Sequence, residues 1–221
     1  MKTKLSAILL TLLLILSLAA CKGNTTAPET TAQPETTAAQ PQDETSEETT
    51  ENTTEAKTGK VLVVYFSATG TTKGVAEKIA NITGADLYEI KPAQAYTDAD
   101  LNWNDRSSRS TEEQNNKSAR PEIAGETLSL DGYSTIYIGY PIWWGEEPRI
   151  MDTFVESYDF NGITMVPFCT SSSSGIGRSG KNLEENAGSG TWLEGERFGA
   201  NAQDGEIQMW IHSLQSSHQN I

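Results

Sequence analysis

The fold is decided by residues 61–72, VLVVYFSATGTT, an apolar run that ends abruptly in hydroxyl-bearing residues and a glycine. A continuous β-branched and aromatic run is typical of a central strand in a parallel sheet, which is buried on both faces. The residues that follow predict a turn into a helix, with Thr71 or Thr72 as the helix cap. Backbone amides at a helix start can bind a phosphate without any cationic side chain. A capped turn that binds no ligand is the alternative interpretation.

The remainder of the globular region alternates strand and helix. Further strands are expected at 86–91, 133–140, 163–169 and 192–198, the first of them near an edge because it is less hydrophobic. Helices are expected at about 72–84, 148–158, 180–187 and 207–214, with a short polar helix at 105–117. Such an order predicts an α/β fold, a doubly wound five-stranded parallel sheet with helices on both faces. No insertion splits the fifth strand.

Composition excludes several classes of function. The chain of 221 residues has 16 Lys and Arg against 30 Asp and Glu, a net charge of −14, so no basic surface for nucleic acid is expected. Cys21 and Cys169 lie in unrelated contexts and do not indicate a disulfide framework. His212 and His218 lack nearby cysteine or carboxylate ligands, so a metal site of the zinc type is not expected.

The first 59 residues indicate export and tethering. Lys2 and Lys4 precede an apolar run over 5–20, which is typical of a signal peptide comprising residues 1–20. The sequence LAAC at 18–21 resembles the lipobox of bacterial lipoproteins, which predicts cleavage before Cys21 and a lipid on its thiol. An uncleaved anchor, or cleavage without lipid, is the alternative. Residues 22–59 are rich in Thr, Glu and Pro and predict a disordered tether, so the globular domain spans 60–221 outside the cytoplasmic membrane.

Three loops are expected at the carboxyl ends of the strands, where ligands of open parallel sheets bind. In the first, Gly70 allows close approach of the backbone and the hydroxyl side chains offer donors, although the spacing is not that of a Walker A loop. The second, 141–145, carries two adjacent tryptophans, which indicate a planar ligand to stack on, with core packing as the alternative for one of them. The third, 170–180, includes a G-x-G-x-x-G match that is weak evidence for a dinucleotide at this distance from its strand. At its entrance, Cys169 is expected to be a small buried residue rather than a nucleophile.

Together these loops resemble the flavodoxin family over residues 60–221. Ser67–Thr72 matches that family's [ST]-x-T-G-x-T loop for the phosphate of flavin mononucleotide (FMN), and Pro141–Gly145 resembles a P-I-W-W-G loop that flanks the flavin ring. Thr170 and the serines that follow it correspond to the loop at the edge of the flavin ring. The resemblance therefore implies that FMN is bound by the following residues: Ser67, Ala68, Thr69, Gly70, Thr71, Thr72, Pro141, Ile142, Trp143, Trp144, Gly145, Thr170, Ser171, Ser172 and Gly175.

The resemblance implies an electron-transfer flavoprotein, in which backbone groups near Trp143 to Gly145 face the ring nitrogen that gains a proton. Residues 60–221 hold 12 basic and 22 acidic side chains. This excess is expected to lower the second reduction potential of the flavin and to steer a basic redox partner toward it. One alternative is an FMN-dependent NAD(P)H oxidoreductase of quinones, with Arg106, Arg109 or Arg178 at the donor's phosphates. Another is a lipoprotein that binds a phosphorylated ligand without redox chemistry.

Overall fold

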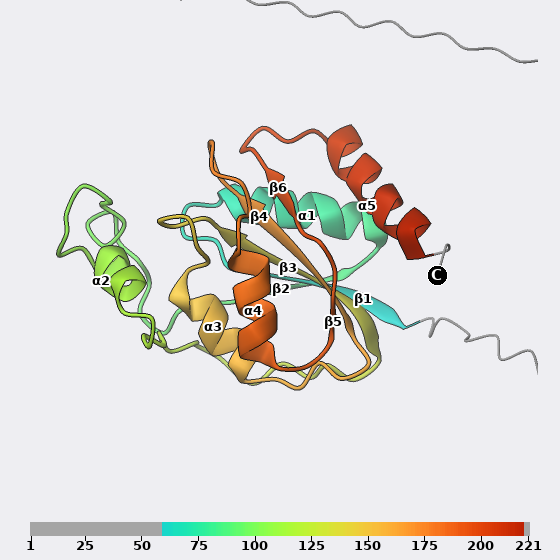
Figure 1. Ribbon diagram of the computed structural model, residues 1–221, viewed down its shortest axis with the longest axis horizontal. Coiled ribbons are helices and arrows are strands. Elements are labelled where there is room, and N and C mark those ends of the chain that lie inside the picture. Colours follow the sequence, from blue (N-terminus) through green and yellow to red (C-terminus); the bar gives the residue numbers. More distant parts are fainter. Residues whose placement is uncertain (1–58, 219–221) are drawn as a thin grey trace, which may run out of the picture. The chain divides into compact units, whose positions relative to one another are not determined.

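The sheet has the predicted parallel topology. A computed structural model describes residues 59–218, and Figure 1 shows its elements in chain order. The sheet order is β2-β1-β3-β4-β5, and all strand pairs in it are parallel. The strands are β1 (Lys60–Tyr65), β2 (Asp86–Glu89), β3 (Tyr133–Pro141), β4 (Thr164–Thr170), β5 (Thr191–Trp192) and β6 (Glu196–Phe198). The doubly wound α/β fold and the edge position of the second strand are confirmed.

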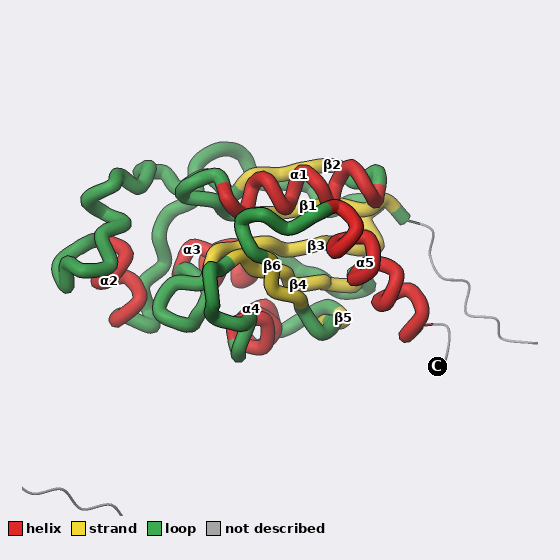
Figure 2. Tube along the Cα trace, turned by 90° about the horizontal axis from the view of Figure 1, so that it is seen from above, coloured by secondary structure: helices red, strands yellow, loops and turns green. Residues whose placement is uncertain are grey.

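Helices cover both faces of the sheet, with α1 and α5 over one face and α3 and α4 over the other (Figures 1 and 2). The helices are α1 (Thr71–Thr83), α2 (Arg109–Asn115), α3 (Arg149–Glu156), α4 (Ser179–Ala187) and α5 (Asp204–His218). The α2 segment lies beyond the end of the sheet to which the β3 and β4 arrows point in Figure 1. None of the helices in the described part is long and apolar enough to span a membrane.

Two hydrophobic cores follow from the alternation of side chains along the strands. Leu62 and Val64 of β1 face the core under α3 and α4, whereas Val63 and Tyr65 face the core under α1 and α5. All four side chains are at most 2% exposed. A strand buried on both faces can occupy only the interior of the sheet, as the apolar run predicts.

The fifth strand differs from the expectation because it is broken into β5 and β6, which both pair with β4. The amide of Leu193 donates to the Met165 carbonyl, 2.9 Å away. In a parallel ladder the Leu193 carbonyl would next accept from the amide of residue 167, which here is Pro167 and has no N–H. The ladder is therefore lost over 193–195 and resumes at Glu196, opposite Phe168. No large insertion is present at this break.

The polar helix is also shorter than predicted, α2 covering Arg109–Asn115 only. Its buried side chains are Ser110, Thr111 and Gln114, so it docks through hydrogen bonds rather than through an apolar face. The signal peptide, Cys21 and the tether up to residue 58 lie outside the described residues, so these predictions stand untested.

Candidate functional site

The turn after β1 forms an uncapped helix start. Gly70 is the residue before α1, with φ 88°, and no side chain caps the helix. The prediction of a Thr71 or Thr72 cap is therefore wrong. The Thr72 hydroxyl is instead buried against the Thr170 hydroxyl, 2.8 Å away, and the Gly70 amide donates to Ser67 Oγ at 3.1 Å. A glycine is required here because a side chain at this φ would be strained.

This turn has the chemistry of an anion site. The first amides of a helix have no intrahelical acceptor, and the helix dipole places partial positive charge there. The hydroxyls of Thr69 and Thr71 lie 3.5 Å apart on the exposed side of the turn. The turn can therefore offer amide and hydroxyl donors to one tetrahedral anion such as a phosphate.

The loop after β3 forms a tight turn with a strained tryptophan at its tip. Trp143 and Glu146 exchange backbone hydrogen bonds of 2.9 and 3.0 Å. Trp144 has φ 50° and Gly145 φ 83°, the left-handed pair that a primed two-residue turn requires. For a tryptophan this conformation is unfavourable, and such strain concentrates at functional sites.

The two adjacent tryptophans have different environments. Trp143 packs edge-on against Phe66 and Tyr96, with ring centroids 5.6 and 5.2 Å away. Trp144 is 47% exposed. Trp143 therefore anchors the turn to the core, and Trp144 remains the side chain able to stack on a planar ligand.

The loop after β4 is tied to both other loops. The Ile142 amide donates to the Thr170 carbonyl at 3.0 Å, and the Thr170 hydroxyl meets Thr72. Arg197 on β6, which the sequence analysis did not identify, donates to Ser171 Oγ at 3.3 Å and to the Ser172 carbonyl at 2.7 Å. The backbone of Gly177 approaches the Gly145 carbonyl, so all three loops meet at one end of the sheet.

A cleft of about 430 Å³ lies between the loops after β1 and β3 and the excursion that carries α2. It is lined by Ala68, Thr69, Thr72, Leu101, Trp103, Ser110, Pro141, Ile142, Trp143 and Trp144. None of these side chains is charged, which agrees with an anion site built from amides and hydroxyls. The predicted residues that are not in this lining are Ser67, Gly70, Thr71, Gly145, Thr170, Ser171, Ser172 and Gly175.

The cleft residues Leu101, Trp103 and Ser110 are not among the site residues predicted from the sequence. Trp103 is 74% exposed, and its isolation in a polar stretch is the signal that could have identified it. A large exposed ring at the edge of a cleft is available to contact a planar ligand. Leu101, Trp103 and Ser110 thus bring the excursion between β2 and β3 to the edge of the cleft.

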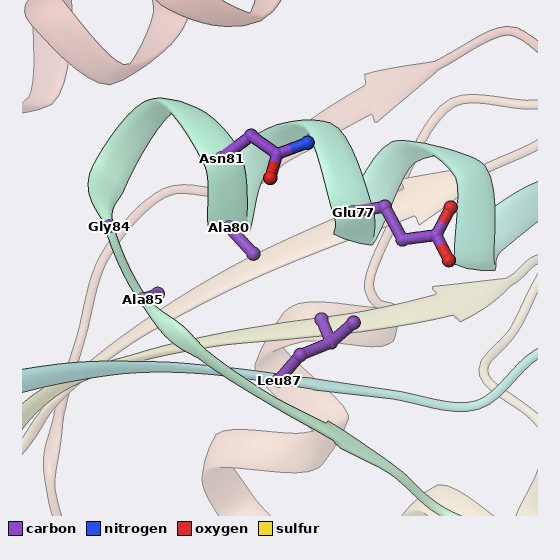
Figure 3. Close-up of a pocket in the computed structure, with 6 residues that line it drawn as sticks. All are labelled: Glu77, Ala80, Asn81, Gly84, Ala85 and Leu87. Carbon is purple, nitrogen blue, oxygen red and sulfur yellow. The ribbon is translucent and has the colours of Figure 1, made fainter.

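A larger hollow of about 600 Å³ lies elsewhere, between α1 and β2 (Figure 3). It is lined by Glu77, Ala80, Asn81, Gly84, Ala85 and Leu87. Because α1 runs back along the sheet from its start at Thr71, the turn at Gly84 lies at the opposite end from the three loops. No strained residue or uncapped helix start faces this hollow, so we do not assign the site to it.

Cys169 is fully buried in β4, as expected from the sequence. Burial raises the pKa of its thiol to about 12. A thiol with so high a pKa carries almost no thiolate at neutral pH, so Cys169 is a packing residue.

Behind the strained turn lies a cluster of buried charges. The Glu147 and Asp152 side chains are both 1% exposed, and Arg149 places Nη1 3.5 Å from a carboxylate oxygen of each. Burial raises the pKa of Glu147 from 4.5 to about 7, and burial also raises the pKa of Asp152. These two buried carboxyl groups and the partly exposed Glu146, 2.6 Å from Arg149 Nη2, thus share one guanidinium next to the loop that bounds the cleft.

Comparison with known proteins identifies the family of the chain. The family profile described as flavodoxin matches residues 60–214. Proteins from Bacteroides eggerthii and Bacteroides uniformis, assigned as flavoproteins, are 43% and 45% identical, cover 71% and 70% of this chain and 98% of their own, and each superpose with a TM-score of 0.67. A Lactobacillus acidophilus flavoprotein, solved in complex with FMN, is 26% identical over 69% of this chain and 98% of its own, with a TM-score of 0.54. Comparison with curated proteins gives no match. The chain therefore belongs to the flavodoxin family.

Proposed function

We propose that the protein is an electron-transfer flavoprotein whose FMN phosphate binds the Ser67–Thr72 turn and whose flavin ring lies against Trp144. FMN is the cofactor, which family membership and the FMN complex of the Lactobacillus relative support. The observation that carries the proposal is the cleft itself. It joins an uncapped helix start to a strained turn with a half-exposed tryptophan.

Each loop has a role that follows from its contacts. Amides at the start of α1 and the hydroxyls of Thr69 and Thr71 would bind the phosphate, and Trp144 would stack on the ring. Thr170 fixes the two ends of the site relative to each other, because its hydroxyl bonds the Thr72 hydroxyl of the phosphate turn and its carbonyl accepts from the Ile142 amide of the loop after β3. Bound FMN would supply reversible electron uptake, and the protein would control its position, its solvent access and the charge around it.

The contacts of the candidate arginines favour a carrier over an enzyme that binds a nicotinamide donor. Arg109, a candidate for binding a nicotinamide phosphate, is already engaged: it pairs with Glu113 at 2.7 Å and lies over the Tyr96 ring at 4.1 Å. Arg178 is exposed and 3.6 Å from Glu185. Arg109 and Arg178, two of the three candidate arginines, therefore act as a structural residue and a surface residue.

The test is to reduce the purified, FMN-loaded full chain in the absence of oxygen. We expect dithionite to bleach the flavin absorbance and NADH or NADPH alone to leave it unchanged over minutes. The reduced protein should then pass electrons to cytochrome c, a basic haem protein, more slowly at high salt, because the acidic domain steers a basic partner. Rapid bleaching by NADH or NADPH would instead establish the oxidoreductase alternative. A purified protein that neither contains nor takes up FMN would favour a non-redox ligand.

We propose further that a lipid on Cys21 holds the domain outside the cytoplasmic membrane, with residues 22–59 as the spacer. The signal-like run and the lipobox-like LAAC support this location. Labelling cells with a radioactive fatty acid should mark the wild-type protein and leave Cys21→Ser unlabelled. Equal labelling of both proteins, or none of the wild type, would contradict the anchor.

A further inference from the structure

In the excursion between β2 and β3, the Gln114 side chain of α2 reaches the backbone of the strained turn. Its Nε2 donates to the Trp143 carbonyl at 3.1 Å and to the Glu147 carbonyl at 3.2 Å. These carbonyls flank the turn residues 144–146 on either side. A single amide group therefore spans the base of the turn whose tip is Trp144.

The same residue is held in place by the buried arginine. Arg149 Nη2 donates to the Gln114 carbonyl at 3.2 Å and to Glu146 Oε2 at 2.6 Å. Its Nη1 is shared between Glu147 and Asp152, and Asn182 of α4 donates to Glu147 at 3.1 and 3.3 Å. The turn, α2, α3 and α4 are thus joined in one polar cluster.

This cluster is an inefficient way to stabilise a fold. Gln114 and Arg149 are 8% and 4% exposed, and Gln114 Oε1 and Arg149 Nε are buried without a hydrogen-bond partner among the described residues. Buried polar atoms left unsatisfied cost free energy, and apolar side chains of similar volume often stabilise as well or better. Such a cluster does, however, fix the direction of the carbonyls that it binds.

We propose that Gln114 is a positioning residue for the flavin: it fixes the turn at 143–147 in the shape that presents Trp144 and the neighbouring backbone to the ring. The proposal rests on the proposed function, because it requires the ring to lie at this turn. It also gives the excursion a role, since its helix contacts the turn through Gln114 while Leu101 and Trp103 line the cleft.

The test replaces Gln114 by methionine, which has nearly the same volume and no donor. Gln94→Met is the matched control, because Gln94 lies on the same excursion with an exposed side chain. Gln114→Glu is a second variant that keeps the polarity and also lacks the two N–H donors. We measure the FMN dissociation constant, the two flavin potentials, and hydrogen exchange over 141–148 in the cofactor-free full chain.

We expect Gln114→Met and Gln114→Glu to bind FMN about tenfold more weakly than wild type and Gln94→Met, as the loss of one or two buried hydrogen bonds implies. Both potentials should shift, and the amides over 141–148 should exchange faster even without cofactor. If wild type binds FMN while both Gln114 variants match it in affinity, potentials and exchange, this inference is overturned and the proposed function stands. If wild type binds no FMN, the proposed function fails and this role fails with it.

Discussion

Replacing Glu147 by glutamine is expected to remove a pH dependence from the stability of the fold. The Glu147 carboxyl is 1% exposed and accepts hydrogen bonds from Asn182 of α4. The charged groups facing it are Arg149 and Asp152 of α3, with Glu146 of the turn on the far side of Arg149. Burial is the largest influence on its pKa, and repulsion from Asp152 adds to it. Together they outweigh the hydrogen bonds from its own backbone amide and from Asn182 and the attraction of Arg149, all of which lower the pKa.

The sign follows from the direction of the shift. Because the pKa is raised from 4.5 to about 7, the folded protein holds the proton of Glu147 more tightly than the unfolded chain does. The resulting stabilisation is complete below pH 4.5 and is lost as the pH rises through about 7. A pKa difference of about 2.5 corresponds to about 3 kcal/mol of unfolding free energy. Glutamine does not titrate, so the variant should not show this loss.

The measurement is urea unfolding at pH 5, 6, 7 and 8, followed by tryptophan fluorescence. The unfolding free energy of Glu147→Gln minus that of wild type should rise by about 2 to 3 kcal/mol from pH 5 to pH 8. Glu112→Gln, at an exposed position on α2, should run parallel to wild type. A constant difference between Glu147→Gln and wild type at every pH would refute the reasoning, because the buried carboxyl would then not be the titrating group.

Three further predictions concern the loops. Gly70→Ala should lower the unfolding free energy by about 1 to 2 kcal/mol and weaken FMN binding, because alanine is strained at φ 88° although its Cβ would meet no neighbour. Urea unfolding and FMN titration measure both effects, and an unchanged affinity would contradict the role of this turn. Trp143→Ala should lower the unfolding free energy by about 2 to 4 kcal/mol, because it removes the aromatic contacts of this side chain. Trp144→Ala should change the unfolding free energy by less than about 1 kcal/mol but alter the visible spectrum of bound flavin. A large loss of stability in Trp144→Ala, with the spectral change in Trp143→Ala instead, would contradict the roles given to the two tryptophans. Thr170→Val should lower the unfolding free energy by about 1 to 2 kcal/mol, because it leaves the Thr72 hydroxyl buried and unpaired. Adding Thr72→Val to this variant should lower the unfolding free energy little further. Additive effects of the two substitutions in a double-mutant cycle would contradict the hydrogen bond between the two hydroxyls.

The sheet could be predicted because its strands are buried on both faces and therefore read as continuous apolar runs. Residues 61–66 and 133–140 carry this signal directly, and their loops carry the residues that resemble the family. The break in the fifth strand could not be foreseen from 192–198 alone. It depends on Pro167 in the neighbouring strand, whose missing N–H matters only once the register of the two strands is known.

The site was predictable where chemistry is local in sequence and not where it depends on tertiary contacts. Gly70 and the two tryptophans stand out by residue type, so the turn and the stacking side chain could be identified. Gln114 and Arg197 could not, because one polar residue in a polar stretch gives no sign of which loop it reaches. The prediction that Thr72 caps the helix is wrong for the same reason, because its hydroxyl is hydrogen-bonded to the hydroxyl of Thr170, which is 98 residues away in the chain.

The central claim is that the Ser67–Thr72 turn binds the phosphate of FMN, and comparing FMN with riboflavin tests it most directly. Riboflavin has the same ring and lacks the phosphate. Because charge-assisted hydrogen bonds to several amides and hydroxyls contribute about 1.5 to 3 kcal/mol each, we expect FMN to bind at least about a hundredfold more tightly. Flavin fluorescence quenching on titration of the cofactor-free protein gives both dissociation constants. Equal affinities for the two flavins would contradict the account.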